Sequence, residues 1–208
     1  NPKDENDIVV VGVSSNWSPG SPKSGIYKSI DGGISWSKSL FFENGYVADM
    51  ILSDPVNWST QYASINGKGV FKSIDGGQTW AFKSSGISSP GRIEIGISSI
   101  DPKIIWASEE TGQLYLSRDG AETWAFMSEA DDLNNFDFLI QGSYDNAVMA
   151  HPFDTNKVYI GGVNIWEFTA TDTETVNKVF DLEDSGTGEF LNFINFSADY
   201  LGGILEIG

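Results

Sequence analysis

The chain has 208 residues, of which 12 are lysine or arginine and 29 are aspartate or glutamate, so its formal charge at pH 7 is −17. It contains one histidine and no cysteine, which excludes disulfides, thiolate nucleophiles, zinc–cysteine sites and iron–sulfur clusters. A field this negative repels phosphate backbones and anionic membranes, and no stretch approaches the roughly 18 apolar residues that span a bilayer. We therefore expect neither nucleic-acid binding nor membrane insertion.

The first predicted repeat unit spans about residues 1–44 and is organised around one hairpin. Apolar, β-branched runs predict strands over 8–12 and 25–28. The second strand leads into the octapeptide S-I-D-G-G-I-S-W at 29–36, whose Asp-Gly-Gly segment predicts a tight turn. In such a turn the aspartate accepts backbone N–H groups and the glycines adopt positive φ. The tryptophan then returns a large apolar surface to the core.

The second and third units, about 45–88 and 89–140, repeat this organisation. The octapeptide returns as S-I-D-G-G-Q-T-W at 73–80 and as S-R-D-G-A-E-T-W at 117–124, each 44 residues after the one before. Each is preceded by a short β-type segment and followed by another. A constant interval of this size predicts four short strands per repeat, which is the size of a β-propeller blade.

The last part of the chain departs from the pattern. Ala121 in the third octapeptide stands where the other two have glycine, and if that position needs positive φ, alanine costs about 1 kcal/mol there. The fourth unit, about 141–185, has a strand-like run at 164–168, but its turn at 171–174 contains no glycine. Residues 186–208 are interpreted as the start of a further blade or as closing strands.

A second turn recurs between the hairpins, where a polar residue followed by proline precedes a strand. His151 occupies this polar position in the fourth unit, so we interpret it as a turn residue. A Ser-His-Asp triad built on it has no supporting nucleophile motif. The four turns are Asn1-Pro2, Asp54-Pro55, Asp101-Pro102 and His151-Pro152.

The octapeptides resemble the Asp-box repeat, S-x-D-x-G-x-T-W, of sialidases, sortilin-type receptors, xyloglucan-cleaving glycoside hydrolases and photosystem II assembly factors. The resemblance covers residues 1 to about 180 and implies an all-β fold of propeller blades, each with four antiparallel strands. It implies no activity, because the box is a structural turn that usually lies away from the ligand face. The box residues with this structural role are Ser29, Asp31, Gly33, Trp36, Ser73, Asp75, Gly77, Trp80, Ser117, Asp119 and Trp124.

Asp-box propellers usually have six or more blades, so the resemblance implies that residues 1–208 form a single segment of a partial propeller. The chain starts without a methionine or a signal-like segment, which we interpret as a processed or excised piece. A four-bladed ring closed by the tail is the alternative. An incomplete arc exposes sheet edges, so we expect the rest of a larger propeller, or a partner, to cover them.

Sialidase activity is excluded by counting arginines. That family holds the substrate carboxylate with three arginines, and this chain has only Arg92 and Arg118. The two catalytic aspartates of the xyloglucan-cleaving family come from separate lobes of a much longer chain, and neither maps onto a local motif here. A catalytic residue is needed once, whereas the box aspartates recur three times. No catalytic residue is therefore assigned.

Three tryptophans outside the boxes, Trp17, Trp58 and Trp106, lie in or near loops and strand starts. They are candidates for a sugar-stacking surface, and ordinary packing is the alternative. The acidic stretches 128–138 and 181–189 offer oxygen ligands for calcium, but neither has the D-x-[DN]-x-[DN]-G spacing. We therefore favour solvated acidic loops and assign neither a cofactor nor a metal ligand.

These observations predict a non-catalytic module of a secreted, cell-surface or periplasmic protein, of bacterial type. It would act as a scaffold, or bind a glycan or another protein through loops opposite the Asp-box turns. The alternative is part of a glycan-processing glycoside hydrolase whose catalytic carboxylates lie partly outside this chain. A third reading is an assembly factor, as in the photosystem family, but the basic patch of that family has no counterpart in this acidic sequence.

Overall fold

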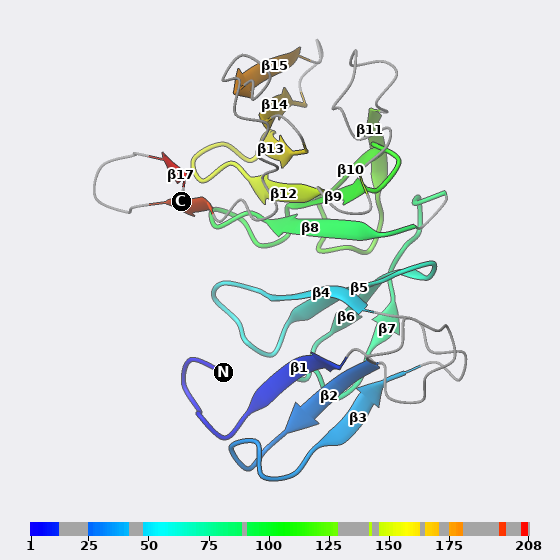
Figure 1. Cartoon of the computed structure of the whole chain (residues 1–208), viewed down its shortest axis with the longest axis vertical. Helices are drawn as coiled ribbons and strands as arrows, with labels where there is room; N and C mark the ends of the chain where they lie inside the picture. Colours follow the sequence, from blue (N-terminus) through cyan, green and yellow to red (C-terminus); the bar gives the residue numbers. More distant parts are fainter. Residues whose placement is uncertain are drawn as a thin grey trace, which may run out of the picture. The chain divides into compact units, whose positions relative to one another are not determined.

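Short antiparallel strands make up the regular structure of the chain (Figure 1). In the computed structural model, the described residues are 1–12, 25–41, 48–88, 91–128, 142, 146–162, 165–170, 175–180, 196–198 and 205–207. Within these ranges, no helix has the length and apolarity needed to cross a membrane. The chain divides into two compact units, Asn1–Ile93 with Ala121–Thr123, and Glu94–Gly120 with Trp124–Gly208.

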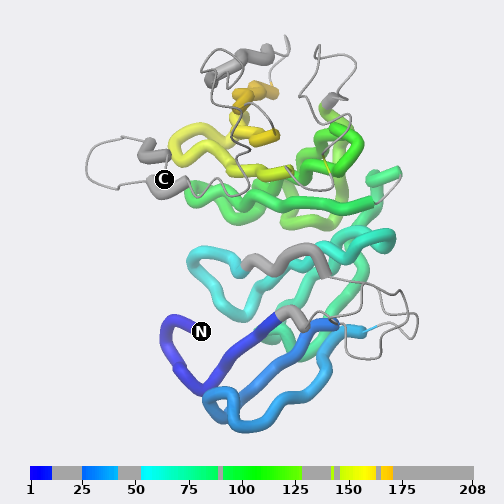
Figure 2. Tube along the Cα trace, viewed as in Figure 1, coloured from blue at the N-terminus to red at the C-terminus, as the bar shows by residue number. Residues whose placement is uncertain are grey.

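The first unit contains two sheets that follow chain order (Figure 1). One sheet has the order β1-β2-β3 and the other has the order β4-β5-β6-β7. The free edge of β1 has no partner strand among the described residues. In Figure 2 the dark blue trace of the N-terminal loop runs directly into β1. The bounds are β1 (Ile8–Gly12), β2 (Gly25–Ser29), β3 (Ser37–Leu40), β4 (Ala48–Ser53), β5 (Gln61–Ile65), β6 (Gly69–Ser73) and β7 (Ala81–Phe82).

The second unit holds two further four-stranded sheets and a small hairpin. Their orders are β11-β10-β9-β8, β12-β13-β14-β15 and β16-β17, with β8 beginning at the boundary between the units. The bounds are β8 (Ile93–Ile97), β9 (Ile105–Glu109), β10 (Leu114–Ser117), β11 (Ala125–Ser128), β12 (Ala147–Ala150), β13 (Lys157–Gly161), β14 (Ile165–Thr169), β15 (Thr175–Phe180), β16 (Phe196–Ala198) and β17 (Leu205–Ile207).

The register of the strands repeats as the sequence does. The serine that opens each box is the last residue of its strand, and it pairs with the first residue of the strand before. The strand that ends with this serine is the second of three in the first sheet and the third of four in the next two. These pairs are Ser29 with Ile8, Ser73 with Gln61, and Ser117 with Ile105. The 44-residue period is therefore a period of structure, with each box turn held at the same place on its sheet.

The core of each unit lies between neighbouring sheets. Middle strands such as β5 and β9 are buried at every position, because both faces of the sheet are covered. In the first unit, Ile26, Ala63, Ile65 and Phe71 form one buried cluster, with Trp80 packed against it. In the second unit the buried cluster is Ile104, Trp106, Leu114, Leu116, Ala150, Val158, Ile160 and Phe168.

The box tryptophans, all expected in the core, differ in their exposure. Trp124 is 5% exposed, Trp80 is half-buried, and Trp36 is 43% exposed. Trp80 packs against the core shared with the preceding sheet, where its Nε1 donates to Ser39 Oγ at 3.2 Å. In the described part of the chain, no sheet precedes the first one. One side of Trp36 is therefore left in solvent, and the expectation of a core position was wrong for this residue.

Candidate functional site

Each box turn is closed by its own serine and aspartate. In the first box, Ser29 Oγ donates to Asp31 Oδ1 at 2.8 Å and accepts the N–H of Gly33 at 2.8 Å. Asp31 also accepts the backbone N–H of Ser35 at 2.9 Å and its hydroxyl at 2.6 Å. These bonds span at most four residues, so the octapeptide encodes its own turn.

The second box repeats this geometry. Asp75 accepts the backbone N–H of Thr79 at 2.8 Å and its hydroxyl at 2.6 Å, and Ser73 Oγ accepts the N–H of Gly77 at 2.9 Å. The Ser35 bonds lower the pKa of Asp31 to about 2. Burial raises the pKa of Asp75, but the Thr79 bonds outweigh it and bring the value to about 2. Both carboxylates are ionised at neutral pH and are occupied within their turns.

The third box keeps the fold of the turn despite its alanine. Ser117 Oγ donates to Asp119 Oδ1 at 2.8 Å, as in the other boxes. Ala121 has φ of +67°, the only positive φ of a non-glycine residue in the described ranges. The equivalent glycines, Gly33 and Gly77, have φ of +86° and +81°. Alanine thus adopts the left-handed conformation that the turn requires, and the turn is kept.

The proline turns are closed in the same manner by a side-chain acceptor. The side chain of each polar residue accepts the backbone N–H two positions later, at 2.8–3.1 Å. His151 does this through Nδ1, which accepts from Phe153, so the histidine is the turn residue that the sequence predicted. Its ring also packs against Tyr159, with centroids 5.4 Å apart, and burial lowers its pKa.

Four loops of the first unit come together at one end of its sheets. We call them the box-end surface: 1–7, 29–36, 53–60 and 73–80. The backbone N–H of Gly32 donates to Asn6 at 3.1 Å, and that of Gly76 donates to Ser59 at 2.9 Å. Each box turn is therefore bound to the neighbouring loop of its own sheet.

A buried ion pair connects the loops of the two sheets. Lys28 is 9% exposed, and its ammonium donates to Asp7 Oδ1 and to the carbonyl of Gly76. Asp7 Oδ2 accepts the indole N–H of Trp58 at 2.7 Å and the side-chain amide of Asn1 at 3.0 Å. Burial raises the pKa of Asp7, but these hydrogen bonds, that of Lys28 first, lower it below its usual value. Sequence analysis did not predict this cluster, because Asp7 and Lys28 are 21 residues apart in the first repeat unit, and their partners Trp58 and Gly76 belong to the second.

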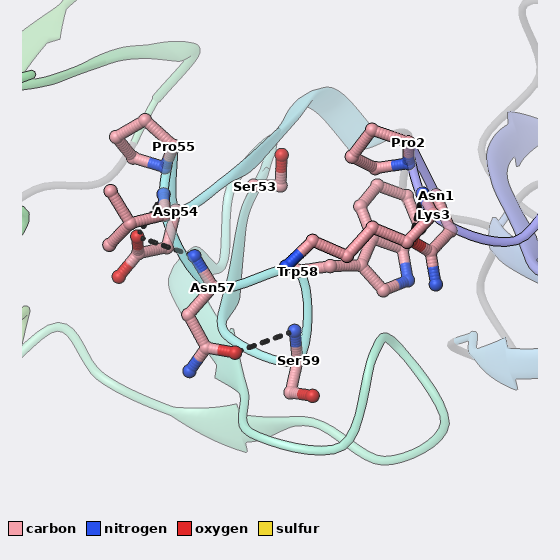
Figure 3. A pocket seen from close by; sticks show the side chains of 10 residues that line it. Asn1, Pro2, Lys3, Ser53, Asp54, Pro55, Asn57, Trp58 and Ser59 are labelled. Carbon is pink, nitrogen blue, oxygen red and sulfur yellow. Dashed lines mark hydrogen bonds between the residues drawn. The ribbon is translucent and has the colours of Figure 1, made fainter.

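A hollow of about 320 Å³ opens on this surface (Figure 3). Figure 3 shows Trp58 and Lys3 on one side of it and Asp54 and Pro55 on the other. Asp54 Oδ1 accepts two backbone N–H groups of its own turn, at 2.8 and 3.1 Å. Within the described residues its second oxygen accepts no hydrogen bond. The hollow thus combines an indole, an ammonium and a carboxylate oxygen open to a ligand.

The three candidate surface tryptophans have different positions. Trp58 is half-buried and lines the hollow, with its ring held by the bond to Asp7. Trp106 is fully buried and packs edge-to-face on Phe168 at 5.9 Å, so its assignment to a ligand surface was wrong. Trp106 lies on β9, a middle strand of its sheet that is buried at every position. Its place near the start of a predicted strand did not indicate this burial. Trp17 lies outside the described residues.

The candidate calcium loops are not covered by the structure. Of 128–138 only Ser128 is described, and all of 181–189 lies outside the described residues. Across the ranges that are described, no three acidic or histidine side chains are grouped as metal ligands. The expected absence of a metal therefore stays a prediction.

Comparison with known proteins relates the chain to solved propellers. No protein-family model matches it, and no curated protein does. An ancestral GH74 enzyme is similar at 17% identity over 86% of this chain and 24% of its own, with a TM-score of 0.56. YCF48 from Cyanidioschyzon merolae is similar at 20% identity over 84% and 58%, with a TM-score of 0.52. An auxiliary nutrient binding protein from Bacteroides thetaiotaomicron is similar at 11% identity over 85% and 39%, with a TM-score of 0.51.

At these identities the likeness shows the fold. The chain spans between about a quarter and three fifths of the length of these three structures, which agrees with the prediction of a partial propeller. Its own sheets have three or four antiparallel strands joined by Asp-box turns. The chain therefore has the all-β fold of Asp-box propeller blades.

Proposed function

We propose that the chain is a non-catalytic binding or scaffold module of a secreted or cell-surface protein, with a glycan or another protein as its ligand. The hollow beside Trp58 carries the proposal. It offers an aromatic ring, an ammonium and a carboxylate on loops that hydrogen bonds hold in place, and such preorganised groups favour binding. One of the similar structures is described as an auxiliary nutrient binding protein, which supports a binding role.

The recurring carboxylates support the same reading. Asp31 and Asp75 each accept several hydrogen bonds inside their own turns, so neither is placed to transfer a proton to a substrate. The net charge of −17 favours neutral glycans or basic proteins as ligands. The sequence-based expectation placed the ligand on the loops opposite the boxes. The hollow lies instead on the end of the sheets that carries the box turns, so the proposed ligand site differs from that expectation.

A screen of the purified chain against a glycan array and a panel of purified acidic and basic proteins tests the proposal. We expect binding in at least one of the two screens. Binding in neither would contradict a ligand-binding role. Detection of the protein in culture medium or on intact source cells tests its location, and a protein confined to the cytoplasm would contradict secretion.

The alternative is a share in a glycoside hydrolase, which the likeness to an ancestral GH74 enzyme favours at the level of fold. In that case the catalytic carboxylates lie partly outside this chain. Polysaccharide hydrolysis by the full-length protein, lost on Asp54→Asn and retained on Asp75→Asn, would support this alternative. Absence of turnover with an intact glycan-binding signal would support the non-catalytic module.

A further inference from the structure

The box-end surface exposes an unusual number of large aliphatic side chains. Ile34 is 87% exposed, Ile30 is 76% exposed, and Ile74 and Val56 are each 74% exposed. Turn tips are ordinarily polar, and single exposed aliphatic residues need no explanation. Four of them on loops tied by hydrogen bonds point to a surface that a partner covers.

The same loops carry an excess of negative charge. Asp31 and Asp75 are ionised at neutral pH, and their partners are neutral N–H and O–H groups rather than cations. Asp54 adds a third carboxylate, and Asp4 and Glu5 add two more on the N-terminal loop. The ammonium of Lys28 is committed to Asp7 and Gly76, which leaves Lys3 as the cation on the exposed part of these loops.

Apolar and acidic groups meet at the hollow. Pro55 lies beside Asp54 on one side of the hollow, and Trp58 lies on the other (Figure 3). Val56 also lines the hollow. The second oxygen of Asp54 can accept a charge-assisted hydrogen bond from a cation seated in the hollow. Lys3 across the hollow disfavours a second cation there, so the site suits one basic side chain flanked by apolar ones.

We propose that the box-end surface of the first unit docks a basic, amphipathic peptide segment of a partner protein. A lysine or arginine of the segment pairs with Asp54, and its apolar side chains cover Ile34, Ile74 and Val56. This inference rests on the proposed binding function and names its partner by chemistry. Nucleic acids and anionic membranes carry the wrong charge for this surface.

Titration of the whole chain with a short synthetic peptide, with leucines on one face and lysines on the other, tests the proposal. A second peptide with glutamate in place of each lysine is the matched ligand control. We expect the basic peptide to bind, with an affinity that falls as salt rises, and the acidic peptide not to bind. Isothermal titration calorimetry measures both.

Two variants and one control locate the site. Asp54→Asn keeps the oxygen that closes the turn, as Asn1 does in its own turn, and removes the charge. We expect this variant, and the double variant Ile34→Ser/Ile74→Ser, each to weaken peptide binding about tenfold. Phe153→Ser changes an exposed apolar side chain of the second unit and should leave the affinity unchanged.

The outcomes separate this inference from the proposed function. Equal weakening by Phe153→Ser, or no change with Asp54→Asn, would overturn the box-end site. Failure of the basic peptide together with a positive glycan or protein screen would overturn the basic partner and leave the binding function standing. Failure of the peptide and of both screens would overturn both.

Discussion

The box aspartates make the stability of the fold depend on pH. Asp31 and Asp75 have a pKa of about 2 in the folded chain, against an ordinary value of 3.8. Because the folded pKa is lowered, the stabilisation from these carboxylates is fully present above pH 3.8 and is lost as the pH falls toward 2. Their exposure to solvent keeps each contribution small.

We therefore expect the free energy of unfolding to decrease between about pH 4 and pH 2. The variant Asp75→Asn should lower stability at pH 7 and flatten this decrease, because its amide cannot be protonated in the same way. Urea denaturation at a series of pH values measures both effects. A slope identical to that of the unaltered chain would contradict the assignment.

The box position held by Gly33, Gly77 and Ala121 has positive φ. It distinguishes the backbone cost of a left-handed residue from the steric cost of an added Cβ atom. Ala121 shows that this turn position accepts a Cβ atom at φ of +67°. A Cβ on Gly33 would meet its nearest atom, Trp36 Cζ2, at 3.4 Å, which is ordinary contact. A Cβ on Gly77 would lie 2.7 Å from Gln61 Oε1 and 2.8 Å from a methyl of Val9.

Gly33→Ala should therefore cost about 1 kcal/mol, the price of the left-handed conformation. Gly77→Ala should cost about 2–4 kcal/mol, since its neighbours must also move. Chemical denaturation of the two variants side by side gives the comparison. Equal losses would show that the packing around Gly77 relaxes freely.

At the scale of elements, the four proline turns are closed by the same hydrogen bond, although the side chains that accept it belong to three residue types. Asn1, Asp54, Asp101 and His151 each accept the N–H two positions later. A histidine performs this role only while Nδ1 is unprotonated. The turn of the fourth unit therefore responds to pH through an imidazole, whereas the other three turns are closed by an amide or a carboxylate.

Burial lowers the pKa of His151 below 6.5, although Glu167 and Asp154 act in the opposite direction and Lys157 acts with burial. The neutral imidazole is thus favoured by folding. Its stabilisation is present above pH 6.5 and is lost as the pH falls below that value. We expect His151→Asn to keep the turn closed and to remove this part of the pH dependence. Thermal unfolding of the variant and the unaltered chain between pH 5 and pH 7.5 measures it, and an unchanged profile would contradict the role.

At the scale of the whole molecule, stability within the first unit depends on contacts between repeats. The Asp7–Lys28 ion pair is mostly buried and also holds Trp58 and Gly76, so it joins loops of both sheets. Removing one member of such a pair leaves the other charge without a partner in a poorly solvated place.

Lys28→Met and Asp7→Asn should each lower the free energy of unfolding by about 2–4 kcal/mol. The double variant should cost clearly less than the sum, because no uncompensated charge then remains. A double-mutant cycle by urea denaturation measures the coupling. Additive losses would show that the pair contributes little as a pair.

What the sequence determined by itself is local. The bonds from Asp31 to Ser35, the φ of Ala121 and the acceptor role of His151 each involve residues at most four positions apart, and the repeat made them visible. The 44-residue period likewise predicted the blades, and in the structure the strand register repeats with the same period, because equal segments form equal sheets.

Only the tertiary structure decided how residues at equivalent positions of the repeats differ in burial and in contacts. Trp36 is exposed and Trp124 buried from the same motif position, because burial depends on whether a sheet covers that face. Trp106 is fully buried for the same reason, since both faces of its strand are covered. Trp58 meets Asp7 across 51 residues of sequence, and that contact fixes the indole that lines the hollow. Such contacts follow from how successive sheets pack, and no local pattern in a repeat records that packing.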